Sequence, residues 1–150
     1  MEAAGLNDVV LVVDDAPSIV ETVSFLLEAK GFPTLTAADG QAGLDLALLH
    51  RPRVVVVDAN MPVLDGYGLC RALRATPALA GCYIVFITGD VQATIRRRAV
   101  EAGADLYMQK PIDAEKLESV VAEAFAGTRV SEGTSKGVRV VVRTNRRPAS

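Results

Sequence analysis

The segment Val54-Val55-Val56-Val57-Asp58 places four consecutive valines directly before one carboxylate. A run that is apolar on both faces is typical of a strand in the middle of a parallel sheet, where helices cover both sides. The next residues, Ala59-Asn60-Met61-Pro62, cannot continue a regular strand. Open α/β sheets carry their functional groups at the carboxyl ends of such strands. We therefore take Asp58 as the starting point of the functional site.

Strand-like and helix-like segments alternate along the chain around this run. Apolar runs predict strands at 8–13, 32–37, 54–58, 83–87 and 106–108, each followed by a segment with helical periodicity. Four of these helices begin after a predicted aspartate N-cap: Asp39, Asp65, Asp90 and Asp113. This order predicts an α/β fold with a doubly wound five-stranded parallel sheet, strand order 2-1-3-4-5, and five helices on both faces.

Length and composition indicate one domain with an aliphatic core. Of the 150 residues, 50% are hydrophobic but only 5% are aromatic. Cys70 and Cys82 have neither a pairing pattern nor metal-ligand spacing, so we expect buried free thiols in a reducing compartment. The sequence contains no 18-residue apolar run and no leader-like segment, which predicts a cytoplasmic protein without membrane contact.

The net charge of −2 hides an uneven distribution. Residues 1–127 hold 10 Lys and Arg against 17 Asp and Glu, whereas residues 128–150 hold 6 against 1. We therefore separate a domain at 1–127 from a basic C-terminal tail at 128–150. The near-alternation of 138–143 would suit a strand added to a sheet edge, in this molecule or a neighbour, whereas Gly133 and Gly137 indicate a linker or a solvated extension. A docking arm is the alternative, and six scattered cations do not predict nucleic-acid binding.

Several polar residues follow the predicted strands, at the edge where parallel strands end. Asp14 and Asp15 follow the first strand, Asp58 ends the third, Thr88 follows the fourth and Lys110 the fifth. Because the first and third strands are neighbours in this order, the three carboxylates are expected in one cleft. Clustered carboxylates require a cation, and an all-oxygen set favours Mg²⁺.

Together these residues make the chain similar to the receiver domain of two-component response regulators. The resemblance covers roughly residues 7–127. Single elements of it are common, but their combination on successive strand ends is specific. The elements that carry the resemblance are Asp14-Asp15, Asp58, Met61-Pro62, Asp65-Gly66, Thr88, Gly103-Ala104-Asp105 and Tyr107-Met108-Gln109-Lys110-Pro111.

The resemblance implies that Asp58 is a phosphoacceptor. Its carboxylate would attack a phosphohistidine of a sensor histidine kinase or a histidine phosphotransfer protein and form an acyl phosphate. Asp15, Asp58 and the backbone carbonyl of Asn60 match direct Mg²⁺ ligands, and Asp14 matches a ligand that acts through a water molecule. Mn²⁺ is the alternative ion.

Three further residues match the phosphoryl contacts and the switch of this family. Lys110 matches the residue that contacts a phosphoryl oxygen, and Thr88 matches the hydroxyl that moves to bond another. Tyr107 matches the switch aromatic, which turns inward as Thr88 moves. The Lys110–Pro111 peptide bond matches one that is usually cis in the family.

The implied output is protein binding on the face made by the fourth helix, the fifth strand and the fifth helix. The chain is then a switch without turnover, apart from self-phosphorylation by small donors and self-dephosphorylation. Its partners are the phosphodonor and a downstream protein, and a dimer that forms on phosphorylation is compatible with the resemblance. Asn60 and Asp90 occupy positions that tune dephosphorylation. Candidate residues of the partner face are Ile95, Arg96, Arg97, Arg98 and Tyr107, although a merely solvated arginine face is the alternative.

Two other functions compete with this interpretation. A Mg²⁺-dependent phosphatase or phosphotransferase would also use Asp58 as its nucleophile, but such enzymes commonly place a second acid two residues later, where this chain has Asn60. A flavodoxin-like FMN carrier would need a hydroxyl-rich phosphate loop after the first strand. The carboxylates of Asp14 and Asp15 would instead repel a phosphate there.

Overall fold

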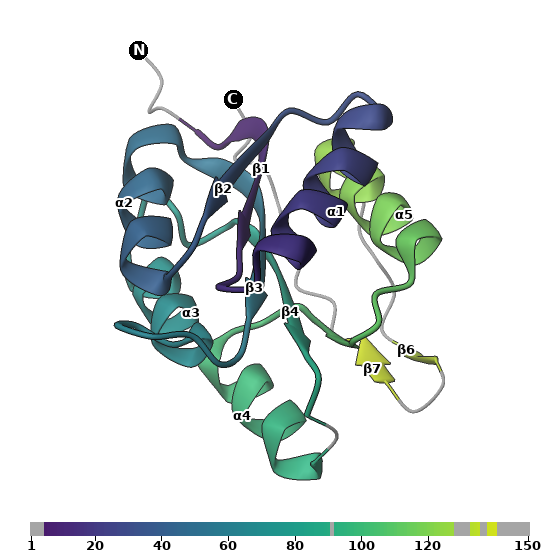
Figure 1. Ribbon diagram of the computed structural model, residues 1–150. Coiled ribbons are helices and arrows are strands. Elements are labelled where there is room, and N and C mark those ends of the chain that lie inside the picture. The colour runs from purple at the N-terminus through teal and green to yellow at the C-terminus, as the bar shows by residue number, and fades with distance from the viewer. Residues whose placement is uncertain (1–4, 91, 128–132, 136–137, 141–150) are drawn as a thin grey trace.

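The computed structural model describes residues 5–90, 92–127, 133–135 and 138–140 (Figure 1). Strands and helices alternate along the chain, as the apolar patterning predicts. The elements are β1 (Asn7–Val13), α1 (Pro17–Ala29), β2 (Thr34–Ala37), α2 (Gly40–His50), β3 (Pro52–Asp58), α3 (Gly66–Ala75), β4 (Tyr83–Thr88), α4 (Ala93–Ala102), β5 (Leu106–Gln109), α5 (Ala114–Phe125), β6 (Gly133–Ser135) and β7 (Val138–Val140).

The five longer strands form a parallel sheet in the order β2-β1-β3-β4-β5, which confirms the predicted topology. In the register of the sheet, Val13 of β1 lies beside Val57 of β3, and Asp58 lies beside Ile87 of β4. The carboxyl ends of β1, β3 and β4 therefore meet at one edge. At the far side, β7 pairs antiparallel with β5 and β6 pairs with β7.

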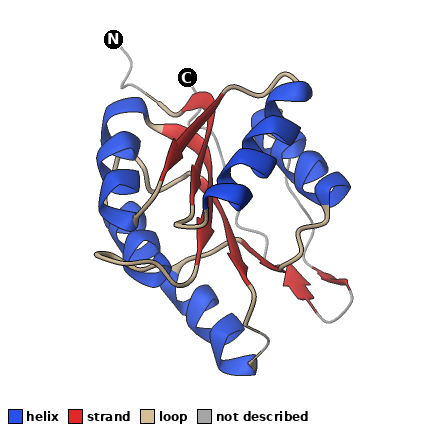
Figure 2. Ribbon diagram, in the orientation of Figure 1, coloured by secondary structure: helices blue, strands red, loops and turns tan. Residues whose placement is uncertain are grey.

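The valines of β3 point alternately into two cores. Val55 and Val57 pack in the core beneath α2, α3 and α4, whereas Val54 and Val56 pack in the core beneath α1 and α5. Figure 2 shows the corresponding layers, with two groups of helices on opposite sides of the red strands. Burial on both sides explains why β3 consists of consecutive β-branched residues rather than an alternating pattern.

Helix starts follow the sequence signals in three cases and depart from them in one. The carboxylates of Asp39, Asp65 and Asp113 accept backbone hydrogen bonds from the third residue after each, as N-caps do. The prediction for Asp90 is wrong, because α4 begins only at Ala93. The Asp90 carboxylate instead accepts from the backbone N–H of Gln92 at 3.0 Å, a local turn that competes with capping.

The second strand and the segment after residue 128 also differ from the sequence prediction. The second strand begins at Thr34 rather than Phe32, because the N–H of Phe32 donates to the Leu27 carbonyl and closes the end of α1. The linker predicted around Gly133 is replaced by β6 over Gly133–Ser135. The strand predicted for 138–143 is described only as Val138–Val140, and residues 141–150 lie outside the described part of the chain.

None of the helices described in the structure combines the length and apolar character that crossing a bilayer requires.

Candidate functional site

Strand β3 delivers the Asp58 carboxylate to the carboxyl edge of the sheet. The residue is only 6% exposed, and its Oδ2 accepts a hydrogen bond from the Asn60 backbone N–H at 3.1 Å. The loop that follows packs closely on this strand, since a Cβ on Gly66 would collide with the backbone carbonyl oxygen of Asp58. Glycine at this position therefore lets α3 begin directly against the base of the site.

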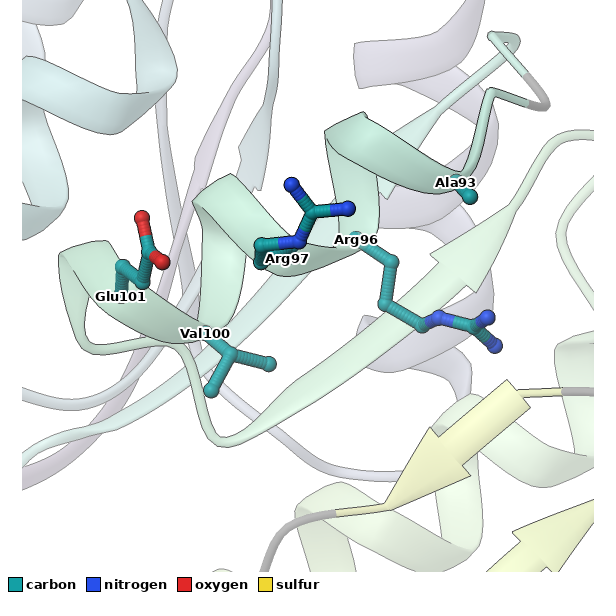
Figure 3. Close-up of a pocket in the computed structure, with 5 residues that line it drawn as sticks. All are labelled: Ala93, Arg96, Arg97, Val100 and Glu101. Atoms are coloured by element: carbon teal, nitrogen blue, oxygen red, sulfur yellow. The ribbon is translucent and has the colours of Figure 1, made fainter.

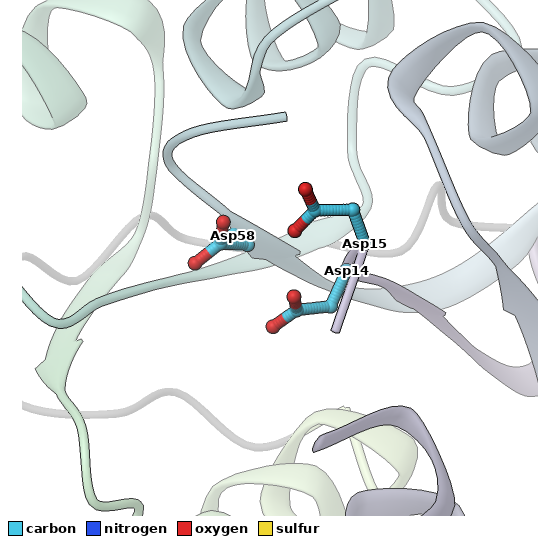
Figure 4. Close-up of side chains that lie close together, drawn as sticks. All are labelled: Asp14, Asp15 and Asp58. Atoms are coloured by element: carbon cyan, nitrogen blue, oxygen red, sulfur yellow. The ribbon is translucent and has the colours of Figure 1, made fainter. Parts of the chain in front are cut away.

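Two more carboxylates reach the same place from the end of β1. Asp14 is buried, and its Oδ1 accepts from the backbone N–H of Ala16 at 2.9 Å, whereas Asp15 is exposed. One oxygen from each of Asp14, Asp15 and Asp58 lies within 4.8 Å of the others (Figure 4). The sequence prediction that these three aspartates lie together is thus met by the structure.

Lys110 neutralises two of the three carboxylates. Its ammonium nitrogen lies 3.0 Å from Asp58 Oδ1 and 3.1 Å from Asp14 Oδ2. The backbone N–H of Lys110 donates to the carbonyl of Thr88 at 2.8 Å, which joins the ends of β4 and β5. The Lys110–Pro111 peptide bond is cis, as the resemblance implies. Asp15 forms no ion pair among the described residues, so its carboxylate is the one left facing solvent.

The pKa values of Asp58 and Lys110 both lie above their ordinary values, but for different reasons. Burial raises the pKa of Asp58 above its ordinary value, the hydrogen bond from Lys110 opposes this, and the nearby Asp14 carboxylate adds to the rise. Burial alone would lower the pKa of Lys110. Its hydrogen bonds to Asp58 and Asp14 outweigh that effect, so the pKa of Lys110 lies above its ordinary value. An additional positive charge near Asp58 would favour its ionised form.

The donor set fits a small divalent cation. Three carboxylates converge, they supply only oxygen ligands, and one of them, Asp15, is open to solvent. Hard ions such as Mg²⁺ bind through one or two carboxylates and retain several waters, which an exposed edge of this kind permits. Receiver domains generally bind Mg²⁺ at such an acidic cluster, and the residues present here suit that ion.

The predicted switch residues meet at the backbone of Asp90. The Thr88 hydroxyl oxygen accepts from the Asp90 N–H at 3.0 Å, and the Tyr107 hydroxyl donates to the Asp90 carbonyl at 3.0 Å. Thr88 is fully buried, and Tyr107 is 4% exposed. The expectation was that Tyr107 turns inward as Thr88 moves. In the structure Tyr107 already lies inside while Thr88 bonds Asp90.

The predicted partner face contains two residues that a partner cannot reach in this conformation. Ile95 is 7% exposed because it fills the core under α4, and Tyr107 is buried as described. Their assignment to the partner face stays a prediction. A shallow hollow on α4 remains accessible, and it is lined by Ala93, Arg96, Arg97, Val100 and Glu101 (Figure 3).

Sequence reasoning missed two contacts that α3 makes with later parts of the chain, one with α4 and one with the turn between α4 and β5. The guanidinium of Arg98 lies 3.9 Å from the ring centroid of Tyr67, whose ring also packs against Phe86. Arg74, at the end of α3, forms a buried ion pair with Asp105. Residues 31 positions apart give no spacing signal, and only the three-dimensional structure reveals this pair.

One family model and several curated proteins match most of this chain. Residues 10–122 match the family model described as the response regulator receiver domain. The chain is 38% identical over 110 residues to the probable transcriptional regulator ycf27 of Cyanophora paradoxa, covering 73% of this chain and 45% of that protein. It is 35% identical over 123 residues to the DNA-binding response regulator MtrA of Mycolicibacterium smegmatis, covering 82% and 51%. The chain thus spans about half the length of the curated relatives it matches.

Solved structures agree in fold. The chemotaxis protein CheY4 of Vibrio cholerae superposes with a TM-score of 0.72 at 30% identity, covering 81% of this chain and 99% of that one. The signal receiver domain of a signal transduction histidine kinase from Syntrophus aciditrophicus superposes with a TM-score of 0.75 at 29% identity, covering 86% and 98%. With the family model matched over residues 10–122, this chain belongs to the response regulator receiver domain family.

Proposed function

We propose that the protein is a phosphorylation-controlled switch in which Asp58 accepts a phosphoryl group from a histidine kinase or a histidine phosphotransfer protein. The observation that carries the proposal is the contact of the buried Asp58 carboxylate with Lys110, beside Asp14 and Asp15. A nucleophilic carboxylate, a cationic side chain and open oxygen ligands are the groups that phosphoryl transfer requires.

In the proposed reaction an Asp58 oxygen attacks the phosphorus of a phosphohistidine. A new O–P bond forms, the N–P bond of the donor breaks, and the electron pair leaves with the imidazole nitrogen. Lys110 keeps Asp58 ionised and, once the phosphoryl group is present, pairs with one of its oxygens. The Asn60 N–H holds Asp58 Oδ2 and so orients the carboxylate for attack.

Asp15, Asp14, Asp58 and the backbone carbonyl of Asn60 are the groups that would hold Mg²⁺, or Mn²⁺ in its place. When bound, the ion supplies positive charge that offsets the negative charge of the transferring phosphoryl group. Asp15 is exposed and carries the role of a direct ligand, whereas the buried Asp14 already bonds Ala16 and Lys110. This difference supports the assignment of Asp14 as a ligand through water.

The read-out of the proposed switch is a movement of α4 and β5. A phosphoryl group on Asp58 attracts the Thr88 hydroxyl, which then leaves the N–H of Asp90. Tyr107 follows because it bonds the carbonyl of the same residue. The face made by α4, β5 and α5 changes, and a downstream protein or a second copy of the chain binds there. We place the protein in the cytoplasm, where its phosphodonor resides.

Asn60 and Asp90 are proposed to tune the lifetime of the acyl phosphate. Asp90 lies two residues after Thr88, is partly exposed, and joins the β4–α4 connection to Thr88 and Tyr107 through its backbone. Its carboxylate is therefore available to influence the water that attacks the phosphoryl group. Asp90→Ala should change the rate of dephosphorylation, and an unchanged rate would remove Asp90 from this role.

A direct test separates the switch from the alternative enzyme. The protein is incubated with acetyl phosphate and Mg²⁺, and its mass is measured with and without acid treatment. A switch gains one acid-labile phosphoryl group, which Asp58→Asn does not gain. A phosphatase or phosphotransferase would instead turn over an added phosphoester continuously. Failure to gain the group under these conditions contradicts the proposal, and continuous turnover favours the enzyme.

A further inference from the structure

The two ends of α4 are held in different ways. At the start of the helix the N-cap residue Gln92 makes no side-chain capping hydrogen bond. The buried residues of α4 are Ile95, Ala99 and Ala102, so little apolar surface anchors it. An uncapped helix start with little burial has low local stability.

The other end of α4 closes on a tight turn. Gly103 follows the helix with φ of +112°, a left-handed conformation that glycine adopts readily. Its N–H donates to the carbonyls of Ala99 at 3.2 Å and Val100 at 3.0 Å, and the N–H of Ala104 donates to Ala99 at 3.0 Å. A Cβ on Gly103 would lie 2.7 Å from Cγ of Arg74, so the two residues are in close contact.

Arg74 binds this turn to two other parts of the chain. Its side chain is only 14% exposed and lies at the end of α3. Nε donates to the carbonyl of Gly103 at 2.9 Å, and Nη1 donates to the carbonyls of Ala80 at 2.8 Å and Cys82 at 2.5 Å. Nη2 donates to Asp105 Oδ2 at 2.5 Å. The planar guanidinium presents these donors in a fixed arrangement that one ammonium group cannot reproduce.

Asp105 completes the connection to the sheet. The same Oδ2 atom accepts from the backbone N–H of Ile84 at 2.8 Å, and the backbone N–H of Asp105 donates to the Ile84 carbonyl at 2.9 Å. Ile84 lies near the start of β4, whereas Thr88 lies at its other end. The Arg74 cluster is thus at the opposite edge of the sheet from Asp58, and it takes no part in the chemistry proposed above.

We propose that Arg74 is a positioning residue that fixes the C-terminal end of α4, so that the helix pivots about Gly103 and moves mainly at its N-terminal end. A helix with one secured end converts a small displacement of the released Asp90 backbone into a directed rotation rather than a loss of structure. The part of this proposal that concerns Arg74 and the Gly103 end of α4 does not depend on the proposed function. The rotation of α4 on loading with a phosphoryl group rests on the proposed function.

A residue that only stabilised the fold would give a different result on removal. Loss of a purely stabilising contact lowers the protection of amides throughout the cooperative unit, because all of them exchange through global unfolding. Loss of a local anchor lowers protection at Gly103, Ala104 and Asp105 first. The distribution of amide protection along the chain therefore discriminates between these two roles of Arg74.

The experiment is amide hydrogen exchange on the full chain, with and without beryllofluoride and Mg²⁺. Four proteins are compared: wild type, Arg74→Met, Arg74→Lys and the matched control Arg71→Met, which removes an exposed arginine from the same helix. Binding of beryllofluoride is followed separately by its fluorine NMR signal. Arg74→Lys retains the positive charge and keeps the test available if Arg74→Met fails to fold.

We expect exchange at residues 103–105 to accelerate at least about tenfold in both Arg74 variants, as the loss of hydrogen bonds to a charged group implies. Amides of α1 and the Arg71→Met control should change little. In wild type, loading should alter exchange in 93–97 but not in 103–105, whereas in the Arg74 variants the response should spread to 103–105.

Uniform acceleration along the chain, unchanged exchange at 103–105, or full rescue by Arg74→Lys would overturn the assignment of Arg74. If beryllofluoride fails to bind the wild type, the proposed function fails instead, and the unloaded comparison still decides whether Arg74 secures the turn. If loading alters 103–105 as strongly as 93–97 in the wild type, the helix does not pivot about Gly103.

Discussion

Thr88 and Tyr107 hold the same residue from two sides: the Thr88 hydroxyl accepts from the Asp90 N–H, and the Tyr107 hydroxyl donates to the Asp90 carbonyl, each at 3.0 Å. Both side chains are buried: Thr88 is the last residue of β4, and Tyr107 lies within the neighbouring strand β5. A displacement of Thr88 toward Asp58 therefore breaks one of two bonds on one peptide segment. The start of α4 follows within three residues.

Thr88→Ala should leave phosphorylation of Asp58 intact but weaken its effect on α4. The variant removes the acceptor for the Asp90 N–H, so the loop loses its connection to the site before and after loading. Tyrosine fluorescence with and without beryllofluoride is a suitable measurement, with Thr94→Ala, an exposed threonine on α4, as the control. A full wild-type response in Thr88→Ala would show that the hydroxyl does not transmit the signal.

Lys110→Met should lower stability and increase the effect of Mg²⁺ on it. Without the ammonium group the buried Asp58 and Asp14 carboxylates lose their cation, which is expected to cost about 1–3 kcal/mol of unfolding free energy. A divalent ion then has more charge to neutralise, so Mg²⁺ should raise the melting temperature of Lys110→Met more than that of wild type. Lys116→Met is the control. Equal responses to Mg²⁺ would mean that lysine and metal do not share these carboxylates.

Asp58→Asn should stabilise the protein near neutral pH in a buffer free of divalent ions. Burial raises the pKa of Asp58 in the folded state above its ordinary value of 3.8. As pH rises through the unfolded-state value, the unfolded chain loses this proton first, so the free energy of unfolding falls until the folded-state pKa is passed. Asp58→Asn lacks this carboxylate, so its free energy of unfolding does not fall in this way as pH rises.

The gain expected for Asp58→Asn at pH 7 is about 0.5–2 kcal/mol, the range typical of single stabilising substitutions. The gain should shrink as pH falls through the folded-state pKa toward 3.8 and vanish below 3.8, where both states of the wild type hold the proton. Urea denaturation at several pH values measures it. Asp45→Asn on the exposed face of α2 should show no such pH dependence. A variant less stable than wild type at pH 7 would contradict the cost ascribed to burying this charge.

Gly66→Ala should destabilise the protein by about 1–3 kcal/mol, as overpacking of a close contact does. The added Cβ would meet the backbone carbonyl of Asp58, so either β3 or α3 must shift. Gly89→Ala is the matched control, because a Cβ at Gly89 has no atom within 4 Å. Thermal unfolding compares the two. Equal stability of both variants would indicate that the loop after β3 adjusts freely.

Much of the fold followed from the sequence because local and global signals agree along it. The run Val54–Val57 predicted a central strand, and its burial on both faces confirms the reason given. Three aspartate caps and the meeting of Asp14, Asp15 and Asp58 also followed from local patterns and from the parallel topology. These features need only the strand order and the direction in which each strand runs.

The features that the sequence did not predict depend on competition between local hydrogen bonds or on contacts between residues far apart in the chain. Asp90 resembles an N-cap in sequence, but its carboxylate bonds Gln92 and α4 starts later. Ile95 stands beside three arginines and was predicted with them as a partner-face residue, and in the structure it lies in the core at 7% exposure. The bonding of Arg74 to Asp105 joins elements that no sequence spacing relates.

The alternation of Val54 to Val57 between two cores has a consequence for how variants combine. Substitutions in the core beneath α4 and substitutions in the core beneath α1 and α5 touch different side chains of the same strand and share no packing partner across the sheet. Their effects on stability should therefore add, as they do for independent sites. Strand β3 thus separates the two cores. Side chains in the core beneath α4 can rearrange while the packing beneath α1 and α5 stays unchanged.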